Sequence, residues 1–233
     1  MGRGDEIRKG VRDTYDRIAP HFARRRGSLW PPMEEFLGSV SPCVIGDLGC
    51  GTGRVVRRAL DLGCEVFAVD SSQGQLDQAR GSVEGPEMMG RVRFIRADLG
   101  SVPIDDGTLD NAMMIASLHH LPDRGSRIEA LREALRILRP KGLLQISVWT
   151  WDQERFRDRH LSRIDGKREP DETDGPLHGD FYVPWKEGEV GYRFYHLYGP
   201  GELEEEIAGS GLILIRSYFD GRNHWCECSA PRQ

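Results

Sequence analysis

The stretch that most constrains this chain is residues 44–53, which read Val-Ile-Gly-Asp-Leu-Gly-Cys-Gly-Thr-Gly. A short apolar run ends in an acid and then in alternating glycines, and residues 54–60 that follow have helical composition. This order is typical of a buried strand that passes through a tight turn into the N-terminus of a helix. Glycines let the backbone approach a ligand closely, and a helix N-terminus offers unpaired N–H groups to an anion. The stretch therefore predicts a ligand-binding unit.

The spacing of the glycines and two acids narrows the kind of ligand. The alternating glycines are Gly49, Gly51 and Gly53. A dinucleotide-binding turn would need its third glycine at position 54, where Arg54 stands. Asp47 would repel a pyrophosphate but suits a ligand that carries ammonium and sulfonium charges. Asp70 ends the next expected strand and can accept hydrogen bonds from both ribose hydroxyls. S-adenosylmethionine is the favoured ligand; a nucleotide and a purely structural turn remain the alternatives.

Length and composition set the broad class. The chain has 233 residues, 38% hydrophobic and 30% charged, which predicts one domain with a core under a charged surface. We expect a single domain over 1–233, with an N-terminal helical lid over 1–40 and an insertion over 152–190. The net charge of −5 excludes a globally basic nucleic-acid binder, so any RNA contact has to be local or shared with a partner.

The cysteines and the hydropathy of the chain indicate the cellular compartment that we expect for this protein. The five cysteines are Cys43, Cys50, Cys64, Cys226 and Cys228. Their odd number and the absence of a Cys-x-x-Cys pair fit a reducing compartment and argue against a zinc site built by this chain alone. No apolar run reaches the roughly 18 residues of a membrane helix, and the N-terminus has no apolar signal core. We therefore expect a soluble, cytoplasmic protein with no membrane contact.

Strand and helix patterns alternate through the middle of the chain. The expected strands are 44–47, 65–69, 91–96, 109–115, 142–149, 212–218 and 223–229. The expected helices are 5–26, 33–40, 53–62, 73–80, 126–138 and 200–209. Helices between parallel strands imply right-handed crossovers that cover both faces of the sheet, and the last two strands read as a hairpin across 220–222. The pattern predicts an α/β fold, a doubly wound, seven-stranded, mostly parallel, Rossmann-like sheet of the methyltransferase type.

Three consecutive arginines close the N-terminal amphipathic helix. Residues 24–26 follow an apolar face of helical period and precede Trp30. A solvated charged face is the usual interpretation of such a run. Its position just before the core domain also suits a lid over the ligand.

Ligands of such sheets bind outside the carboxyl ends of the strands. With that rule, the expected cofactor-binding residues are Asp47, Gly49, Cys50, Gly51, Gly53, Asp70, Ser71, Asp98, Leu99 and Ile115. Asp98 can accept a hydrogen bond from an adenine amino group, or it can cap a turn. His119 and His120 follow the fourth strand, where a methyl group would meet its acceptor, and we expect His120 to face the pocket. A packed or capping histidine is the alternative.

Several segments resemble one family of enzymes. They are Tyr15-Asp16-x-Ile18-Ala19-Pro20-His21-Phe22, Arg26, Trp30, Asp47-x-Gly49-Cys50-Gly51, His119-His120, Trp149, Phe181-x-Val183-Pro184-Trp185, residues 192–198 (Tyr-Arg-Phe-Tyr-His-Leu-Tyr), residues 201–205, Asn223 and Trp225. Together they resemble the class I S-adenosylmethionine-dependent tRNA methyltransferases that act on carboxymethylated wobble uridine. The resemblance spans nearly the whole chain except 152–180. The Val-Pro-Trp and Arg-Phe-Tyr-His-Leu-Tyr segments are its most specific parts.

The resemblance implies methyl esterification of the carboxylate of 5-carboxymethyluridine at tRNA position 34. A carboxylate, with a pKa of roughly 4, is already ionised at neutral pH, so the reaction needs no general base. The residues then expected to act at the reaction centre are Arg26, His120, Trp149, Arg193 and Tyr195. Arg26 and Arg193 would orient the carboxylate. Trp149, Trp185 and Tyr195 would stack on the base or, in the alternative, pack in the core.

The resemblance also implies partners. Besides tRNA, family members work with a small zinc-binding activator protein in a heterodimer, here through the edge strand 91–96. Met88, Met89, Val92 and Phe94 lie in or beside that edge and suit added-strand pairing. Two other functions stay open. One is an O- or C-methyltransferase for a small metabolite, which should have an enclosed apolar pocket; the other is a catalytically silent scaffold.

Overall fold

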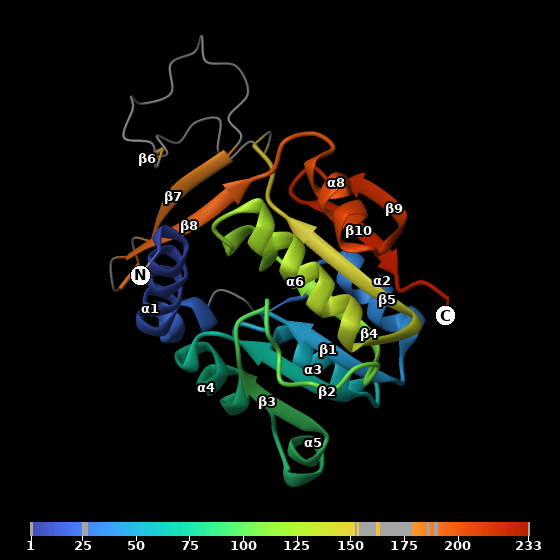
Figure 1. Ribbon diagram of the computed structural model, residues 1–233. Helices are drawn as coiled ribbons and strands as arrows, with labels where there is room; N and C mark the ends of the chain where they lie inside the picture. Colours follow the sequence, from blue (N-terminus) through green and yellow to red (C-terminus); the bar gives the residue numbers. More distant parts are fainter. Residues whose placement is uncertain are drawn as a thin grey trace.

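The structure is a computed structural model that describes residues 2–24, 28–151, 153, 162–163, 179–185, 187–188 and 191–232, with the backbone alone at 162–163. Its centre is a seven-stranded sheet in the order β3-β2-β1-β4-β5-β10-β9 (Figure 1). The strands are β1 Val44–Leu48, β2 Glu65–Asp70, β3 Val92–Arg96, β4 Leu109–Ile115, β5 Leu138–Val148, β9 Ile213–Phe219 and β10 His224–Ser229. Strands β1 to β5 pair in parallel and β10 pairs antiparallel with both of its neighbours. The predicted doubly wound fold is confirmed.

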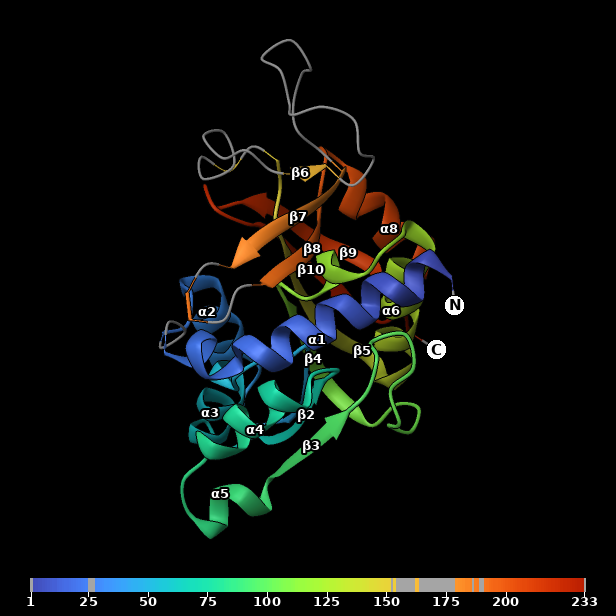
Figure 2. The ribbon, with the colours of Figure 1, turned by 90° about the vertical axis from the view of Figure 1, so that its left-hand side faces the viewer.

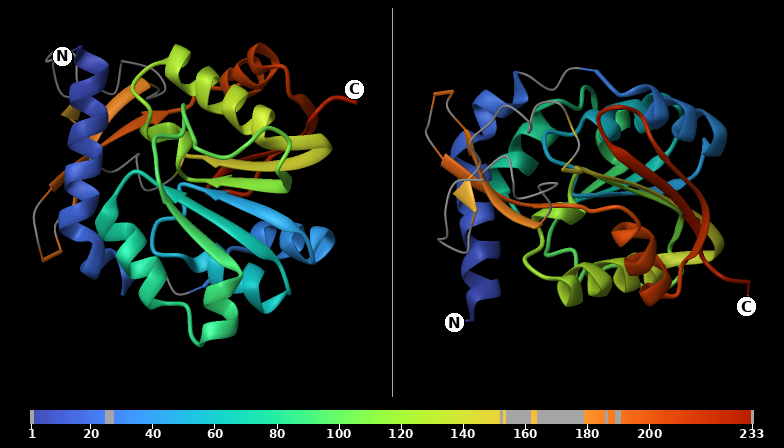
Figure 3. Two further views of the ribbon diagram at one scale, coloured as in Figure 1. Left: turned by 60° about the horizontal axis from the view of Figure 1, so that its bottom comes forward. Right: turned by 90° about the horizontal axis from the view of Figure 1, so that it is seen from above.

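Helices cover both faces of this sheet, as Figure 3 shows. The helices are α1 Arg3–Ala23, α2 Pro31–Val40, α3 Arg54–Asp61, α4 Gln73–Gly81, α5 Pro86–Gly90, α6 Arg124–Ile137 and α8 Glu202–Ser210. Apolar side chains of α2, α3 and α4 form one core with β1 and β2, and those of α6 and α8 form another with β4, β5 and β10. Each of these helices except α5 buries one stripe, because apolar residues recur at helical spacing. Of these helices, the sequence analysis did not predict α5.

One strand begins earlier than its sequence pattern indicates. We expected it to start at residue 142, after a Pro-Lys-Gly turn, but β5 begins at Leu138, directly after α6. Leu138 pairs with Leu109, and the register then shifts, so the turn residues form an irregularity inside the strand. Lys141 takes a positive φ of 66° there. The irregularity absorbs the residues that we had assigned to a turn.

A second, three-stranded sheet was missing from our list of expected elements. It consists of β6 Ser162–Arg163, β7 Gly179–Trp185 and β8 Gly191–Leu197, all antiparallel. Helix α1 lies between this sheet and α4 and contacts α4 and β8 (Figure 2). The Thr14 hydroxyl donates to the backbone carbonyl of Tyr192. The N-terminal helix and the β7–β8 hairpin therefore meet across one end of the central sheet. Arg26 and most of the predicted insertion lie outside the described residues.

Strand β1 lies at the point where the strand order reverses, between β2 and β4. In open α/β sheets, a crevice forms outside the carboxyl ends of the strands at this point. A short 3-10 helix, η1 Leu118–His120, continues from β4 on this side of the sheet. No helix among the described residues has both the length and the apolar character needed to cross a membrane.

Candidate active site

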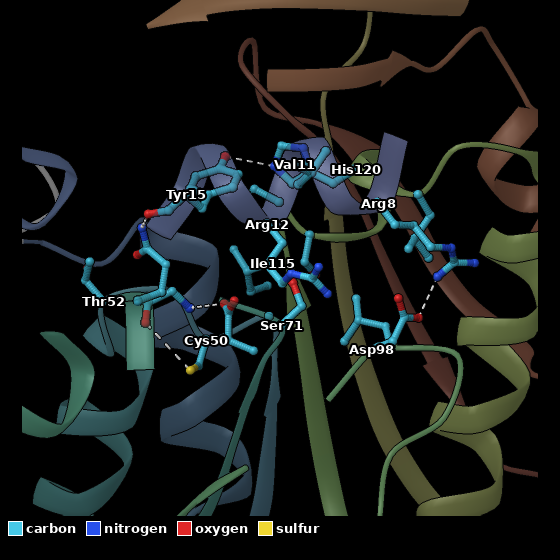
Figure 4. A pocket seen from close by; sticks show the side chains of 18 of the residues that line it. Arg8, Val11, Arg12, Tyr15, Cys50, Thr52, Ser71, Asp98, Ile115 and His120 are labelled. Atoms are coloured by element: carbon cyan, nitrogen blue, oxygen red, sulfur yellow. Dashed lines mark hydrogen bonds and ion pairs between the residues drawn. The ribbon is translucent and has the colours of Figure 1, made fainter. Parts of the chain in front are cut away.

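A pocket of about 390 Å³ lies at these strand ends. Helix α1 and the glycine turn enclose it (Figure 4), together with Tyr195 of β8. Of the residues predicted for the site, those that line it are Gly49, Cys50, Gly51, Asp70, Ser71, Asp98, Leu99, Ile115, His120, Trp149 and Tyr195. Asp47, Gly53 and Arg193 do not line it, and Arg26 lies outside the described residues.

The glycine turn has the close approaches that its sequence suggests. Gly49 has a φ of +88°, and a Cβ atom there would overlap the Ser117 side chain. Gly53 lies one turn further on, where a Cβ atom would come within 2.9 Å of Ala79 of α4. Gly49 thus shapes the pocket, whereas Gly53 lets α3 pack closely against α4.

Asp70 is held at the tip of β2 by backbone donors. Its carboxylate accepts hydrogen bonds from the N–H groups of Gly51 and Ser72, each at 2.9 Å. Burial raises the pKa of Asp70 to about 6, although these hydrogen bonds oppose the rise. The side chain still lines the pocket, so the held carboxylate can accept hydroxyl groups of a ligand.

Asp47 lies beneath the turn and not at the pocket surface. Only 2% of it is exposed, and burial raises the pKa of its carboxyl group to about 7. Among the described residues, its Oδ2 atom is buried without a hydrogen-bond partner. A buried, unsatisfied carboxylate oxygen favours a nearby cationic group. A ligand that carries an ammonium group and lies against the turn would supply one.

Asp98 serves a local turn as well as the pocket. Its Oδ1 atom accepts the backbone N–H of Gly100 at 2.9 Å, which is the turn role that we considered as the alternative. The same atom pairs with Arg8 of α1 at 2.6 Å. Asp98 and Leu99 line the pocket together, and the ion pair ties α1 to its rim (Figure 4).

His120 has a fixed tautomer. Its Nδ1 atom lies 2.7 Å from the carbonyl oxygen of Phe194, so Nδ1 carries the proton and donates it. The Nε2 atom then accepts a hydrogen bond from the Tyr15 hydroxyl at 2.9 Å. His120 lines the pocket, whereas His119 is fully buried behind it. In this arrangement His120 orients its neighbours and needs no proton from the substrate.

Trp149 and Tyr195 stack on each other, with ring centroids 4.3 Å apart and planes inclined by 11°. Both line the pocket although each is at least nine-tenths buried. The two interpretations of these aromatics, pocket wall and core packing, therefore both apply. Arg193 donates to the Tyr195 hydroxyl at 3.0 Å and lies over the ring of Trp185. Its charge lies behind Tyr195, beyond the pocket wall.

The sequence analysis missed the pocket side of α1. Arg8, Arg12 and Tyr15 line the pocket from this helix. They are spaced four and three residues apart and so share one helical face. That spacing was the available signal; the expected lid over 1–40 contains this helix, but Arg26 was the residue of the lid that we expected at the reaction centre. Two more arginines, Arg54 and Arg96, line the pocket from the core domain.

These features fit S-adenosylmethionine. The held carboxylate of Asp70 suits ribose hydroxyls, the buried Asp47 favours a cationic group above the turn, and Leu99 and Ile115 offer apolar surface to a base. Cys50 adds no reactive thiolate, because burial and nearby carboxylates raise the pKa of its thiol well above the ordinary value.

Solved structures share this fold. A Burkholderia thailandensis 1,6-didemethyltoxoflavin-N1-methyltransferase with bound S-adenosylhomocysteine matches with a TM-score of 0.66 and 19% identity, over 99% of this chain and 92% of that one. A Haloferax volcanii methyltransferase, solved in complex with the Trm112 methyltransferase activator, matches with a TM-score of 0.68 and 16% identity over 96% and 98%. The family model described as "Methyltransferase domain" matches residues 45–142. The fold is that of class I S-adenosylmethionine-dependent methyltransferases, and the pocket residues fit this cofactor.

Relatives in sequence share one name. The Schizosaccharomyces pombe tRNA (carboxymethyluridine(34)-5-O)-methyltransferase is 29% identical over 92% of this chain and 93% of its own length. The mouse enzyme of the same name, ALKBH8, is 34% identical over 69% of this chain. The chain is thus similar, over most of its length, to tRNA (carboxymethyluridine(34)-5-O)-methyltransferases. It spans less than half the length of the mouse, frog and macaque relatives, 23%, 41% and 43% respectively.

Proposed function

We propose that this chain methylates the carboxylate of 5-carboxymethyluridine at position 34 of tRNA, giving 5-methoxycarbonylmethyluridine. The names of its relatives support the substrate. The pocket supports the chemistry, because four of its described lining residues are arginines: Arg8, Arg12, Arg54 and Arg96. This cationic lining is the observation that carries the proposal. A pocket for a neutral metabolite would be enclosed and apolar.

For this methyl transfer, the protein mainly has to position the carboxylate and the methyl donor. S-adenosylmethionine supplies the methyl group, activated by its sulfonium charge. One carboxylate oxygen forms the new O–CH₃ bond as the S–CH₃ bond breaks, and S-adenosylhomocysteine leaves without any proton transfer. The residues therefore have to hold an anion in line and exclude water. Arginine side chains at the rim and the Trp149–Tyr195 pair beside it suit an anionic substituent on a base.

The test is methyl transfer from labelled S-adenosylmethionine to matched tRNAs, followed by nucleoside mass spectrometry. One tRNA carries carboxymethyluridine at position 34, and its control carries unmodified uridine there. We expect a methyl ester on the first tRNA only. Methylation of both tRNAs, or of small carboxylic acids alone, would contradict the proposed substrate.

Loss of a rim cation should weaken the reaction selectively. Arg12→Gln removes one charge from the pocket lining, and we expect a KM for tRNA raised by roughly tenfold, in line with one charge-assisted hydrogen bond. Binding of S-adenosylmethionine should stay within about twofold. Arg17→Gln, also on α1 but absent from the pocket lining, is the control.

We further propose that a small zinc-binding activator protein docks on the outer edge of β3. Strand β3 ends the sheet, and Met88, Met89 and Phe94 are only partly buried beside it. The Haloferax volcanii methyltransferase that shares this fold was solved in complex with the Trm112 methyltransferase activator. An edge of this kind suits pairing with a strand of another protein.

The docking test is co-purification with an activator of the Trm112 type. We expect the double variant Met88→Asp/Met89→Asp to lose the complex, whereas Glu84→Asp/Glu87→Asp keeps it. Equal complex formation by both double variants would exclude the outer edge of β3 as the docking site of the activator. The cytoplasmic location expected from the free cysteines stays a prediction, and fractionation of the source cells would check it.

A further inference from the structure

A cluster of three metal-binding side chains lies away from the pocket. Glu204, His224 and Cys226 each offer one ligand atom, and these atoms all lie within 4.8 Å of one another. None of the three lines the pocket described above. The cluster joins α8 to the antiparallel hairpin of β9 and β10, elements that lie together in Figure 1.

The fold explains why these residues meet. His224 and Cys226 are two residues apart on β10, so their side chains point to the same face of the sheet. Ser217 of β9 lies directly opposite Cys226 in the register. Helix α8 packs on this face, and Glu204 is in its first turn. Three elements that are separate in sequence thus deliver an oxygen, a nitrogen and a sulfur ligand to one point.

Hydrogen bonds within the cluster leave one buried carboxylate oxygen of Glu204 without a partner among the described residues. The Ser217 hydroxyl lies 2.5 Å from Oε1 of Glu204 and 2.8 Å from Nε2 of His224, and that carboxylate oxygen lies 2.9 Å from the same nitrogen. Among the described residues, Oε2 of Glu204 is buried and has no hydrogen-bond partner. The Cys226 thiol is fully buried, and burial raises its pKa to about 12. A buried carboxylate oxygen without a donor costs free energy that a cation would offset.

We propose that Glu204, His224 and Cys226 bind one zinc ion. Thiolate, imidazole and carboxylate together are a ligand set that zinc accepts. Zinc–ligand distances of about 2.0–2.3 Å in a tetrahedron separate the ligand atoms by roughly 3–4 Å, which is compatible with this cluster. The thiol proton leaves to solvent when the Zn–S bond forms, and water or the Ser217 hydroxyl takes the fourth position. The ion is structural and ties α8 to the β9–β10 hairpin.

The test uses the purified full chain, stripped with a chelator and then titrated with zinc chloride. We expect one zinc per chain by elemental analysis after gel filtration, and a rise in the thermal midpoint because the metal binds the folded state. Cobalt(II) in place of zinc should give a thiolate charge-transfer absorption band. No retained zinc in the wild-type chain, or a cobalt spectrum without the thiolate band, would overturn the proposal.

Variants locate the site. Cys226→Ser should weaken zinc binding by roughly a hundredfold or more and abolish the thiolate band, because even residues that only support metal ligands change affinity by up to that factor. Glu204→Gln, on a partly exposed side chain, should also weaken binding and tests the site if the buried cysteine variant fails to fold. Cys43→Ser, at the start of the core domain, should keep both zinc and the band. Retention of zinc by Glu204→Gln together with loss in Cys43→Ser would place the metal elsewhere.

Discussion

The hydroxyl of Tyr15 lies 2.9 Å from Nε2 of His120. Tyr15 belongs to the N-terminal helix, and His120 follows the fourth strand of the central sheet. This hydrogen bond therefore joins the part of the pocket wall that α1 contributes, called the roof below, to the part that the central sheet contributes. Because Nδ1 of His120 donates to the backbone of β8, the histidine connects three parts of the fold. The Tyr15 hydroxyl is also 3.3 Å from that of Tyr195. A single side chain of α1 therefore contacts two of the residues expected at the reaction centre, His120 and Tyr195.

Tyr15→Phe should separate positioning from cofactor binding. The variant keeps the ring contacts with Phe22 and His120 but loses the hydroxyl between His120 and Tyr195. We expect the rate of methyl transfer to fall by roughly tenfold, which corresponds to one hydrogen bond of about 1.4 kcal/mol. Calorimetry should find the affinity for S-adenosylmethionine within about twofold of wild type. Tyr192→Phe, on an exposed side chain of β8, is the matched control; an equal loss there would remove the special role of Tyr15.

Asp70→Asn should weaken cofactor binding. The amide keeps the shape of the side chain but loses the charge and one acceptor oxygen, while Gly51 and Ser72 still direct their N–H groups at it. Hydrogen bonds to a charged group contribute about 1.5–3 kcal/mol, so we expect Kd for S-adenosylmethionine to rise roughly 10- to 150-fold. Asp77→Asn on α4 should leave Kd unchanged in the same titration calorimetry. An unchanged Kd in Asp70→Asn would remove the carboxylate from the ligand site.

Asp47 makes stability depend on pH in the absence of cofactor. Burial raises its pKa from 3.8 to about 7, so the folded chain holds this proton more tightly than the unfolded chain. Raising the pH from about 4 to about 7 therefore lowers the free energy of unfolding. Asp47→Asn removes the titrating group, so its stability relative to wild type should increase across this range. Urea unfolding at several pH values measures this, with Asp61→Asn at the end of α3 as control; a constant difference between Asp47→Asn and wild type would contradict the buried charge.

Gly49→Ala tests the geometry of the turn. The positive φ of Gly49 and the overlap of a Cβ atom with Ser117 make the substitution strained. We expect a loss of about 2–3 kcal/mol in unfolding free energy, together with weaker cofactor binding. Gly38→Ala is the control, since Gly38 lies in α2 with no atom within 4 Å of its Cβ position. That variant should gain about 0.5–1 kcal/mol. Equal effects of the two variants would mean that the turn tolerates a side chain.

The central sheet was predictable because its periodicity is local. Alternation of apolar strands and amphipathic helices over 44–148 gives the order of elements, and the final hairpin follows from the turn at Asp220, whose carboxylate accepts the N–H groups of Arg222 and Asn223. Helix α5 has only five residues, follows a glycine and ends in one, and is too short for a helical pattern to show. The segments next to β7 and β8 have no periodic pattern. The sequence therefore did not indicate that these two aromatic segments pair with each other as strands.

From the strand and helix pattern, the pocket was predictable where it uses strand tips, whereas Tyr195 was expected only from the family resemblance. Asp70, Asp98 and Ile115 follow from the rule that ligands bind at the carboxyl ends of strands. The pocket residues of α1 could not be predicted in this way, because a helical pattern does not indicate which element the helix will cover. Arg8 and Arg12 therefore read as solvated charges until α1 is placed over the sheet. The Glu204–His224–Cys226 cluster was not predicted for the same reason, since its members meet only through packing of α8 on the hairpin.

The roof of the pocket also determines when the pocket can form. Tyr15 and Tyr195 are 180 residues apart in sequence, and Thr14 bonds a residue 178 positions away. Contacts of such separation close long loops at an entropic cost, so we expect them to form after the parallel core between β1 and β5. On the ribosome, the finished pocket has to await the emergence of β8, long after the glycine turn is available. Cofactor binding thus reports that the chain has folded as far as β8, and a binding assay on nascent chains of increasing length would time this step.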